Sequence, residues 1–169
     1  MSDSSRLDTP GGAKDHLKLR GDIQIEIHRA GESRPLRRYA IRNTIVLGGL
    51  NSPLYLWSQD TGSPADWRIV RLIPGTIGTP PTSGDVALVS ALTSSDYINL
   101  TSTDRTVLPA SGELVLRGTL TTSQAVGQTL REIGLFLGNG QLFARQVHPA
   151  IEKTGAITVT YTWRIAVTS

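Results

Sequence analysis

The chain has 169 residues, of which 38% are apolar and 18% are charged, and its formal net charge is +3. This length is sufficient for one domain with a buried core. The charged fraction lies below the quarter or so that is typical of soluble domains, and threonine and serine take up the difference. Because threonine is β-branched and suits the exposed face of a strand, the composition favours an all-β fold.

The absence of cysteine excludes disulfides, thiolate metal ligands and cysteine nucleophiles. Residues 1–5 are polar and no run approaches 18 apolar residues, so we expect neither a signal peptide nor a membrane span. The sequence therefore predicts synthesis in a cytoplasm and no contact with a membrane.

Residues 1–17 show no hydrophobic periodicity, and Pro10, Gly11 and Gly12 within them are typical of a turn or linker. We expect an N-terminal arm that is flexible or docked on a partner, followed by a single domain over residues 18–169. Basic residues gather in the first quarter, but acidic residues interleave with them and no aromatic ladder accompanies them. This pattern favours a solvated surface or an acidic protein partner over nucleic acid.

Residues 19–29 predict the first strand, because Ile23, Ile25 and Ile27 alternate there with polar residues. After a turn at residues 30–32, residues 36–47 predict a second strand. We expect Gly48 and Gly49 to end it.

Residues 50–58 predict one short helix, with Pro53 in its first turn and Asn51 or Ser52 as its cap. A short strand is predicted over residues 67–73. Residues 74–84 hold too many prolines and glycines for regular structure and predict a rigid surface loop.

Further strands are predicted over residues 86–92, 97–101 and 113–121, the last with a bulge at Gly118. Residues 133–137 and 141–147 predict a hairpin around a tight turn at residues 138–140. In the final predicted strand every second residue is apolar: Ile157, Val159, Tyr161, Trp163, Ile165 and Val167. Eight or nine strands with one short helix predict an antiparallel β-sandwich, jelly-roll-like in topology.

The sequence offers no motif for catalysis, metal binding or cofactor binding. None of the three histidines, His16, His28 and His148, belongs to a metal-binding pair, and we interpret them as unrelated surface or rim residues. No nucleophile elbow and no phosphate-binding loop is present. The sequence therefore predicts a protein that is not an enzyme and carries no cofactor.

Glu132 is the one carboxylate with an unusual setting, since it lies in an apolar run on the face opposite Ile133 and Leu135. A charge in such a place needs a partner, and Lys153 is the candidate. We interpret the pair as a structural ion pair and not as a catalytic acid, because no second acid or base accompanies it.

Three groups of motifs resemble a group of bacteriophage tail, collar and fibre-associated virion proteins. The first is Asn43-Thr44-Ile45-Val46 with the glycine pair that follows, and the second is the loop of residues 69–81. The third joins residues 132–136, 140–145 and 149–153 to a closing strand through Trp163. The resemblance covers about residues 40–167. Unlike many members, this chain has neither an acidic residue nor an arginine in residues 86–92.

The resemblance implies a β-sandwich that acts through assembly contacts in a virion. It implies a homo-oligomer, either a trimer or a ring of three- or six-fold symmetry, that contacts the tail tube, portal, fibre or capsid. Because the chain stops after the domain, we expect an adaptor, collar or decoration subunit. The structural or assembly candidates are Asn43, Glu132, Gly134, Phe136, Arg145, Lys153 and Trp163.

Two other functions stay open at this point. A capsid decoration protein would have the same size, strand content and arm. A carbohydrate-binding module would need exposed aromatic side chains, and Trp57, Trp67 and Tyr97 are the available platforms.

Overall fold

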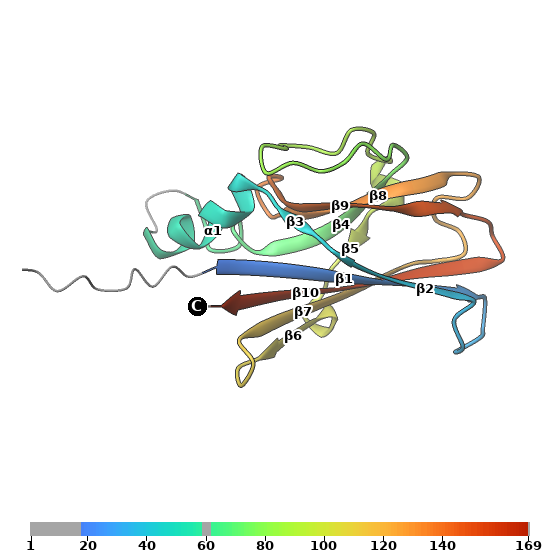
Figure 1. Ribbon diagram of the computed structural model, residues 1–169, viewed down its shortest axis with the longest axis horizontal. Helices are drawn as coiled ribbons and strands as arrows, with labels where there is room; N and C mark the ends of the chain where they lie inside the picture. Colours follow the sequence, from blue (N-terminus) through green and yellow to red (C-terminus); the bar gives the residue numbers. More distant parts are fainter. Residues whose placement is uncertain (1–17, 59–61, 169) are drawn as a thin grey trace, which may run out of the picture.

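The computed structural model describes residues 18–58 and 62–168, and the predicted N-terminal arm lies outside these residues. The chain forms two five-stranded antiparallel sheets that face each other (Figure 1). The first sheet has the spatial order β2 (Arg37–Arg42), β1 (Lys18–Arg29), β10 (Ile157–Thr168), β7 (Glu113–Leu120) and β6 (Arg105–Leu108). The second has the order β3 (Thr44–Ile45), β9 (Leu142–Glu152), β8 (Thr129–Leu137), β4 (Ile69–Gly75) and β5 (Ile98–Asn99).

This architecture confirms the predicted all-β sandwich with one helix, α1 (Leu47–Ser58). Two short 3-10 helices, η1 (Ser94–Asp96) and η2 (Ser102–Asp104), lie in the connection from β4 to β6. A jelly-roll topology stays a prediction. Within the described residues no helix has the length and apolar character needed to cross a membrane.

The interior between the sheets is built by the strands whose alternation was clearest in the sequence. Ile23, Ile25 and Ile27 of β1 are buried, and so are the residues of β10 from Val159 to Ile165 that occupy every second position. They belong to one apolar cluster with residues of β8 and β9 from the opposite sheet. The period of two therefore identified the strands that carry the core.

Several predicted elements differ from the structure. The strand expected over residues 36–47 is two strands, β2 and β3, because the chain crosses from one sheet to the other at Asn43. The strand expected over residues 86–92 does not form. The loop that was predicted to begin at residue 74 begins at Thr76, since Pro74 and Gly75 still belong to β4. The chain is irregular from there through residue 92, apart from one isolated bridge between Gly75 and Ala91.

Gly118 does not mark a bulge, because β7 pairs with β10 in regular register through this residue. Its lack of a side chain serves packing across the sandwich instead. A Cβ atom at this position would lie 2.6 Å from the Cγ2 atom of Ile98. The glycine lets β5 approach the first sheet closely.

Helix α1 begins at Leu47 and includes the two glycines that were expected to end a strand. A Cβ atom on Gly49 would overlap the carbonyl oxygen of Phe143, so the glycine lets the helix lie directly on the start of β9. Pro53 lies inside the helix and has no N–H to donate to the carbonyl of Gly49. The hydroxyl of Ser52 donates to that carbonyl at 2.8 Å and replaces the missing bond.

We expect Gly49→Ala to destabilise the fold by about 1–3 kcal/mol, because the added methyl group displaces α1 from β9. The gain in helix propensity, about 1 kcal/mol, is too small to offset this overlap. Chemical denaturation would measure the difference. Gly84→Ala is the matched control, since its nearest contact would be Thr82 Oγ1 at 3.9 Å. Equal stability of both variants would contradict the role assigned to Gly49.

Candidate functional site

A network of hydrogen-bonded charged side chains lies on the outer face of the second sheet, beneath the loop of residues 76–92 (green, at the top of Figure 1). We call this segment the covering loop. Glu132, Gly134 and Phe136 of β8 point toward it, because Ile133 and Leu135 between them face the core. Both faces of β8 are therefore buried.

Arg145 of β9 is the centre of this feature. The register of the β8–β9 hairpin places Arg145 opposite Gly134 and thus on the same face as Glu132. Its Nε atom donates to Glu132 Oε2 at 2.7 Å, and its Nη1 atom donates to Asp85 Oδ2 at 2.6 Å. Glu132 and Arg145 are 0% and 1% exposed, so this is a fully buried ion pair.

The covering loop is fixed by hydrogen bonds to these two side chains. The Nη2 atom of Arg145 donates to the carbonyl of Thr79 at 2.8 Å. The backbone N–H of Ser90 donates to Glu132 Oε1 at 2.9 Å. Arg145 and Glu132 thereby hold both halves of the loop against the sheet.

Asp85 completes the network from the loop side. Thr82 donates to its carboxylate from both its hydroxyl, at 2.7 Å, and its backbone N–H, at 3.1 Å. Burial raises the pKa of Asp85, but the bonds from Thr82 and Arg145 outweigh it and hold that pKa below its usual value. The carboxylate is therefore ionised at neutral pH.

An apolar contact accompanies the ion network. Leu88 of the covering loop belongs to a second apolar cluster, together with Val46, Ile73, Phe136 and Leu142. A Cβ atom on Gly134 would lie 2.8 Å from the Phe136 ring and 2.9 Å from Leu88. Three alternate residues of β8 therefore each serve the covering loop. Glu132 supplies a charge, Gly134 leaves space for Leu88, and Phe136 supplies an apolar contact.

The predicted pairing of Glu132 with Lys153 is wrong. Lys153 is buried near the end of β9, where its Nζ atom donates to the carbonyl of Thr154 at 2.9 Å. Burial lowers the pKa of Lys153, and the charge of Asp96 offsets this only in part. The predicted hairpin turn alone would not have identified the correct partner, because regular pairing from that turn sets Arg145 opposite Ile133 on the core face. A register shift between Leu135 and Phe136 moves Arg145 opposite Gly134, on the face of Glu132.

The other predicted residues lie in the interior and not at the covering loop. Asn43 and Trp163 are buried, and within the described part of the chain the side-chain amide of Asn43 and Nε1 of Trp163 have no hydrogen-bond partner. Asn43 packs against Gly21, where a Cβ atom would overlap its side chain. The structure thus brings together Glu132, Gly134, Phe136 and Arg145 and separates them from Asn43, Lys153 and Trp163.

His148 is not a surface or rim residue as expected. It is buried in β9 with its ring centroid 6.1 Å from that of Tyr161. Its Nδ1 atom lies 2.8 Å from the carbonyl of Pro149, which can only accept, so Nδ1 carries the proton. Burial lowers the pKa of His148, which keeps the imidazole neutral at neutral pH. Within the described residues no group of three His, Asp or Glu side chains could hold a metal ion.

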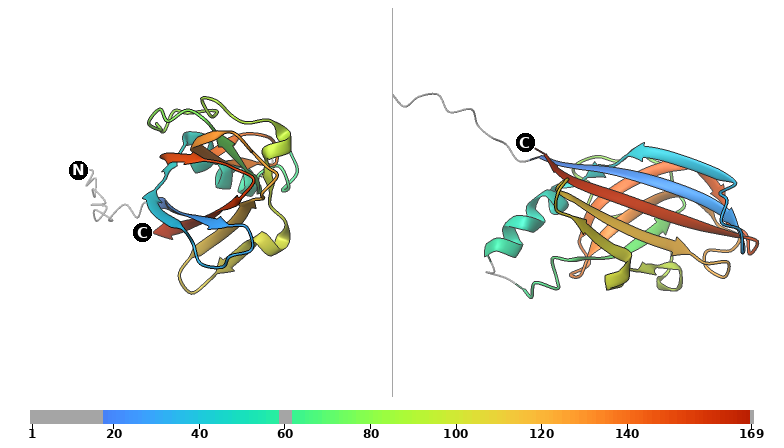
Figure 2. Two further views of the ribbon diagram at one scale, coloured as in Figure 1. Left: turned by 90° about the vertical axis from the view of Figure 1, so that its right-hand side faces the viewer. Right: turned by 90° about the horizontal axis from the view of Figure 1, so that it is seen from below.

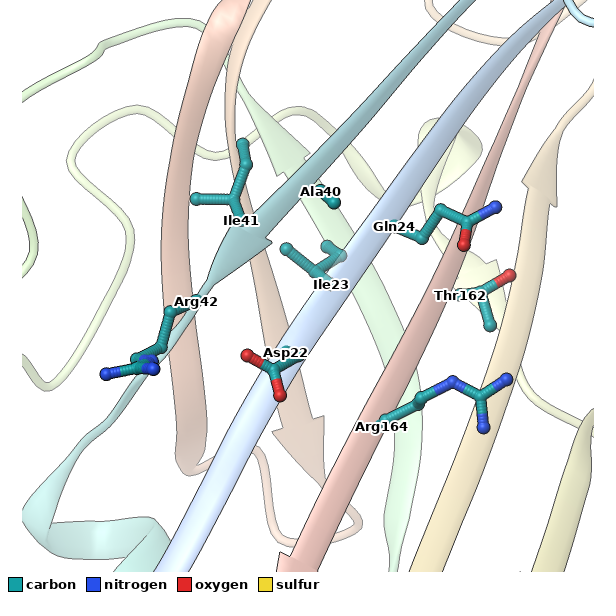
Figure 3. A pocket seen from close by; sticks show the side chains of 8 residues that line it. All are labelled: Asp22, Ile23, Gln24, Ala40, Ile41, Arg42, Thr162 and Arg164. Atoms are coloured by element: carbon teal, nitrogen blue, oxygen red, sulfur yellow. The ribbon is translucent and has the colours of Figure 1, made fainter.

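Figure 3 shows an open hollow of about 360 Å³ on the outer face of the first sheet. It is lined by side chains of β1, β2 and β10. Asp22 is the one carboxylate in the lining, and Arg20 pairs with it at 3.2 Å. The hollow has the polarity to contact another protein or a polar ligand, but its lining contains no second acid or base beside Asp22.

Comparisons with protein-family models, characterised protein sequences and solved structures find no match for this chain.

We expect Arg145→Met to lower the free energy of unfolding by about 3–5 kcal/mol, because it leaves the carboxylate of Glu132 buried without a counter-charge. Chemical denaturation monitored by tryptophan fluorescence would measure the loss. Arg164→Met is the matched control. Arg164 is exposed and lies 3.7 Å from Glu113, so its removal should cost about 0–1 kcal/mol. A loss below 1 kcal/mol for Arg145→Met would contradict the assigned role.

The lowered pKa of Asp85 predicts a pH dependence of stability. A carboxylate whose pKa is lower in the folded state stabilises the fold above its unfolded pKa, about 3.9. We expect this contribution to disappear as the pH falls from about 4 through the lowered folded pKa. Denaturation at a series of pH values between 7 and 2 would show it. In Asp85→Asn the same series should have a smaller slope in the acid range, and an unchanged slope would refute the prediction.

Proposed function

We propose that this chain is a non-enzymatic structural subunit of a bacteriophage virion. In this proposal it lies at the neck or tail as a collar, adaptor or fibre-attachment subunit. It is made in the host cytoplasm, forms a trimer or a three- or six-fold ring, and binds other virion proteins through its outer surfaces. A jelly-roll-like topology is part of the same proposal.

The observation that carries the proposal is that the buried charges hold a surface loop in place. Arg145 donates hydrogen bonds to both Glu132 and Asp85, and these side chains fix a long irregular loop to the outer face of the second sheet. Ionisable groups of an enzyme site instead face a cleft that substrate can enter. A surface loop held in one conformation loses little entropy when it binds a partner, which suits a docking surface.

The fixed loop also presents apolar side chains to solvent. Val86 is 85% exposed and Val89 is 51% exposed, although their neighbour Leu88 is buried. Exposed apolar residues on a pre-organised loop favour a protein partner. The motifs at residues 132–136 and 140–145, which resemble those of tail and collar proteins, supply the residues that hold this loop.

Capsid decoration is the second candidate, because a rigid loop on a sandwich suits attachment to capsomers equally well. The carbohydrate-binding alternative has weaker support. Trp67 is stacked on Tyr55 with ring centroids 4.5 Å apart, and Tyr97 is half-buried against the second apolar cluster. These two aromatic faces are already engaged by protein, and the side chain of the third platform, Trp57, lies outside the described residues.

The proposal predicts that the chain is present in purified particles of the phage that encodes it. Mass spectrometry of the particles should detect it in a copy number that is a multiple of three. Antibody labelling viewed by electron microscopy should place it at the tail or neck. Labelling over the capsomers would favour the decoration protein, and absence from the particles would contradict both. Specific binding on a glycan array would favour the carbohydrate-binding module.

A further inference from the structure

Helix α1 directs large apolar residues toward solvent and small residues toward the sandwich. Gly49 and Ser52 are buried against the sandwich, whereas Leu47, Leu50 and Leu54 face solvent. The three leucines are 57%, 40% and 59% exposed. A surface helix of a monomeric protein normally places its leucines against the core and polar residues outside.

The three leucines form one continuous stripe. They are spaced by three and four residues, so they lie on the same side of the helix. This is the spacing of the contact positions between helices in a bundle. The stripe thus has the form of a helix-packing surface with no second helix against it among residues 18–58 and 62–168.

The helix also contains no charged residue in any of its 12 positions. A partner of either charge would gain no ion pair from it. An identical helix, in contrast, meets it without like-charge repulsion and presents the same leucine spacing. The chemistry of the stripe therefore favours a second copy of this chain over a charged protein, and over a membrane surface, which binds helices that carry lysine or arginine.

The apolar surface extends beyond the three leucines. Tyr55 and Leu56, also in α1, are 43% and 39% exposed. A groove of about 370 Å³ beside Pro53 is lined by Val107, Leu108 and Val167, which are also exposed. All of these lie at the end of the sandwich that holds the C-terminus (Figures 1 and 2). Together they form an apolar surface that extends from α1 to the ends of β6 and β10.

We propose that α1 is the contact between copies of this chain, with the leucine stripes of neighbouring α1 helices packed on one another at the symmetry axis of the oligomer. This inference rests on the self-association in the proposed function and assigns its surface. The stripe and the covering loop are different surfaces that adjoin at Leu47, whose backbone N–H donates to the carbonyl of Ser83 at 2.9 Å.

The test compares Leu50→Glu/Leu54→Glu with the wild-type chain by sedimentation velocity over a range of concentrations. The loss of two leucines from a packed contact should weaken association at least about 100-fold. The circular dichroism spectrum should stay unchanged, because both side chains are exposed. Leu36→Glu is the matched control, since Leu36 is 48% exposed in the β1–β2 turn at the opposite end.

A second measurement uses the absence of cysteine from the chain. Leu47→Cys, Leu50→Cys and Leu54→Cys are oxidised separately at micromolar concentration. Helix-to-helix contact at a symmetry axis predicts a cross-linked dimer on a non-reducing gel for at least one of them. Leu36→Cys should stay monomeric on the gel. Absence of a cross-link from all three α1 variants would overturn the helix-to-helix contact.

The outcomes separate this inference from the proposed function. An oligomeric wild-type chain whose mass is unchanged in Leu50→Glu/Leu54→Glu would refute the α1 contact and leave the virion role intact. A wild-type chain that stays monomeric would contradict the proposed self-association as well. Sedimentation of the wild-type chain, but not the double variant, with phosphatidylglycerol vesicles would assign α1 to a membrane and also overturn the inference.

Discussion

Arg145 joins two parts of the fold through a guanidinium group that is almost completely shielded from water. Removing this cation and the carboxylate of Glu132 from water costs several kcal/mol for each ion, which only close geometry and full hydrogen bonding can offset. The structure meets both conditions, because Nε, Nη1 and Nη2 each have an oxygen acceptor within 2.8 Å. The covering loop is the source of two of these acceptors, so the buried charge and the ordered loop depend on each other.

This dependence shapes the rest of the second sheet. A face that would otherwise be exposed becomes an interior, and Phe136 and Leu142 can be apolar there because Leu88 covers them. Gly75 is needed at the same place, since a Cβ atom would lie 2.6 Å from Glu132 Oε1 and from the carbonyl oxygen of Ser90. The sequence around β8 therefore encodes a docking surface for the protein's own loop as well as a strand.

Sequence reasoning succeeded where a local pattern decides the structure and failed where distant residues decide it. The alternation in β1 and β10 is local, and both strands were predicted nearly to the residue. Residues 86–92 also looked like a strand, but only Leu88 is fully buried, because contact with Phe136 and the bond from Ser90 to Glu132 replace strand pairing. The start of α1 was missed because the need for glycine at position 49 comes from contact with the backbone of Phe143, which lies almost 100 residues away in the chain. Glu132 was correctly judged to need a partner, but the partner suggested was Lys153, whereas the shifted register of β8 and β9 places Arg145 on the same face as Glu132.

The sheet edges of this chain are protected against association, whereas helix α1 carries no charge that would protect it. β2 is an edge strand and carries exposed arginines at Arg37, Arg38 and Arg42, a common protection against pairing with another sheet. The edge strands β3 and β5 have two residues each, and β6 is followed by Pro109, so these edges offer little backbone for pairing. Against this background the uncharged α1 is conspicuous, because nothing on it discourages contact. In the oligomer that we propose, protected sheet edges and an unprotected leucine stripe would favour one orientation between copies. Each alternative contact would then cost free energy that the proposed α1 contact does not.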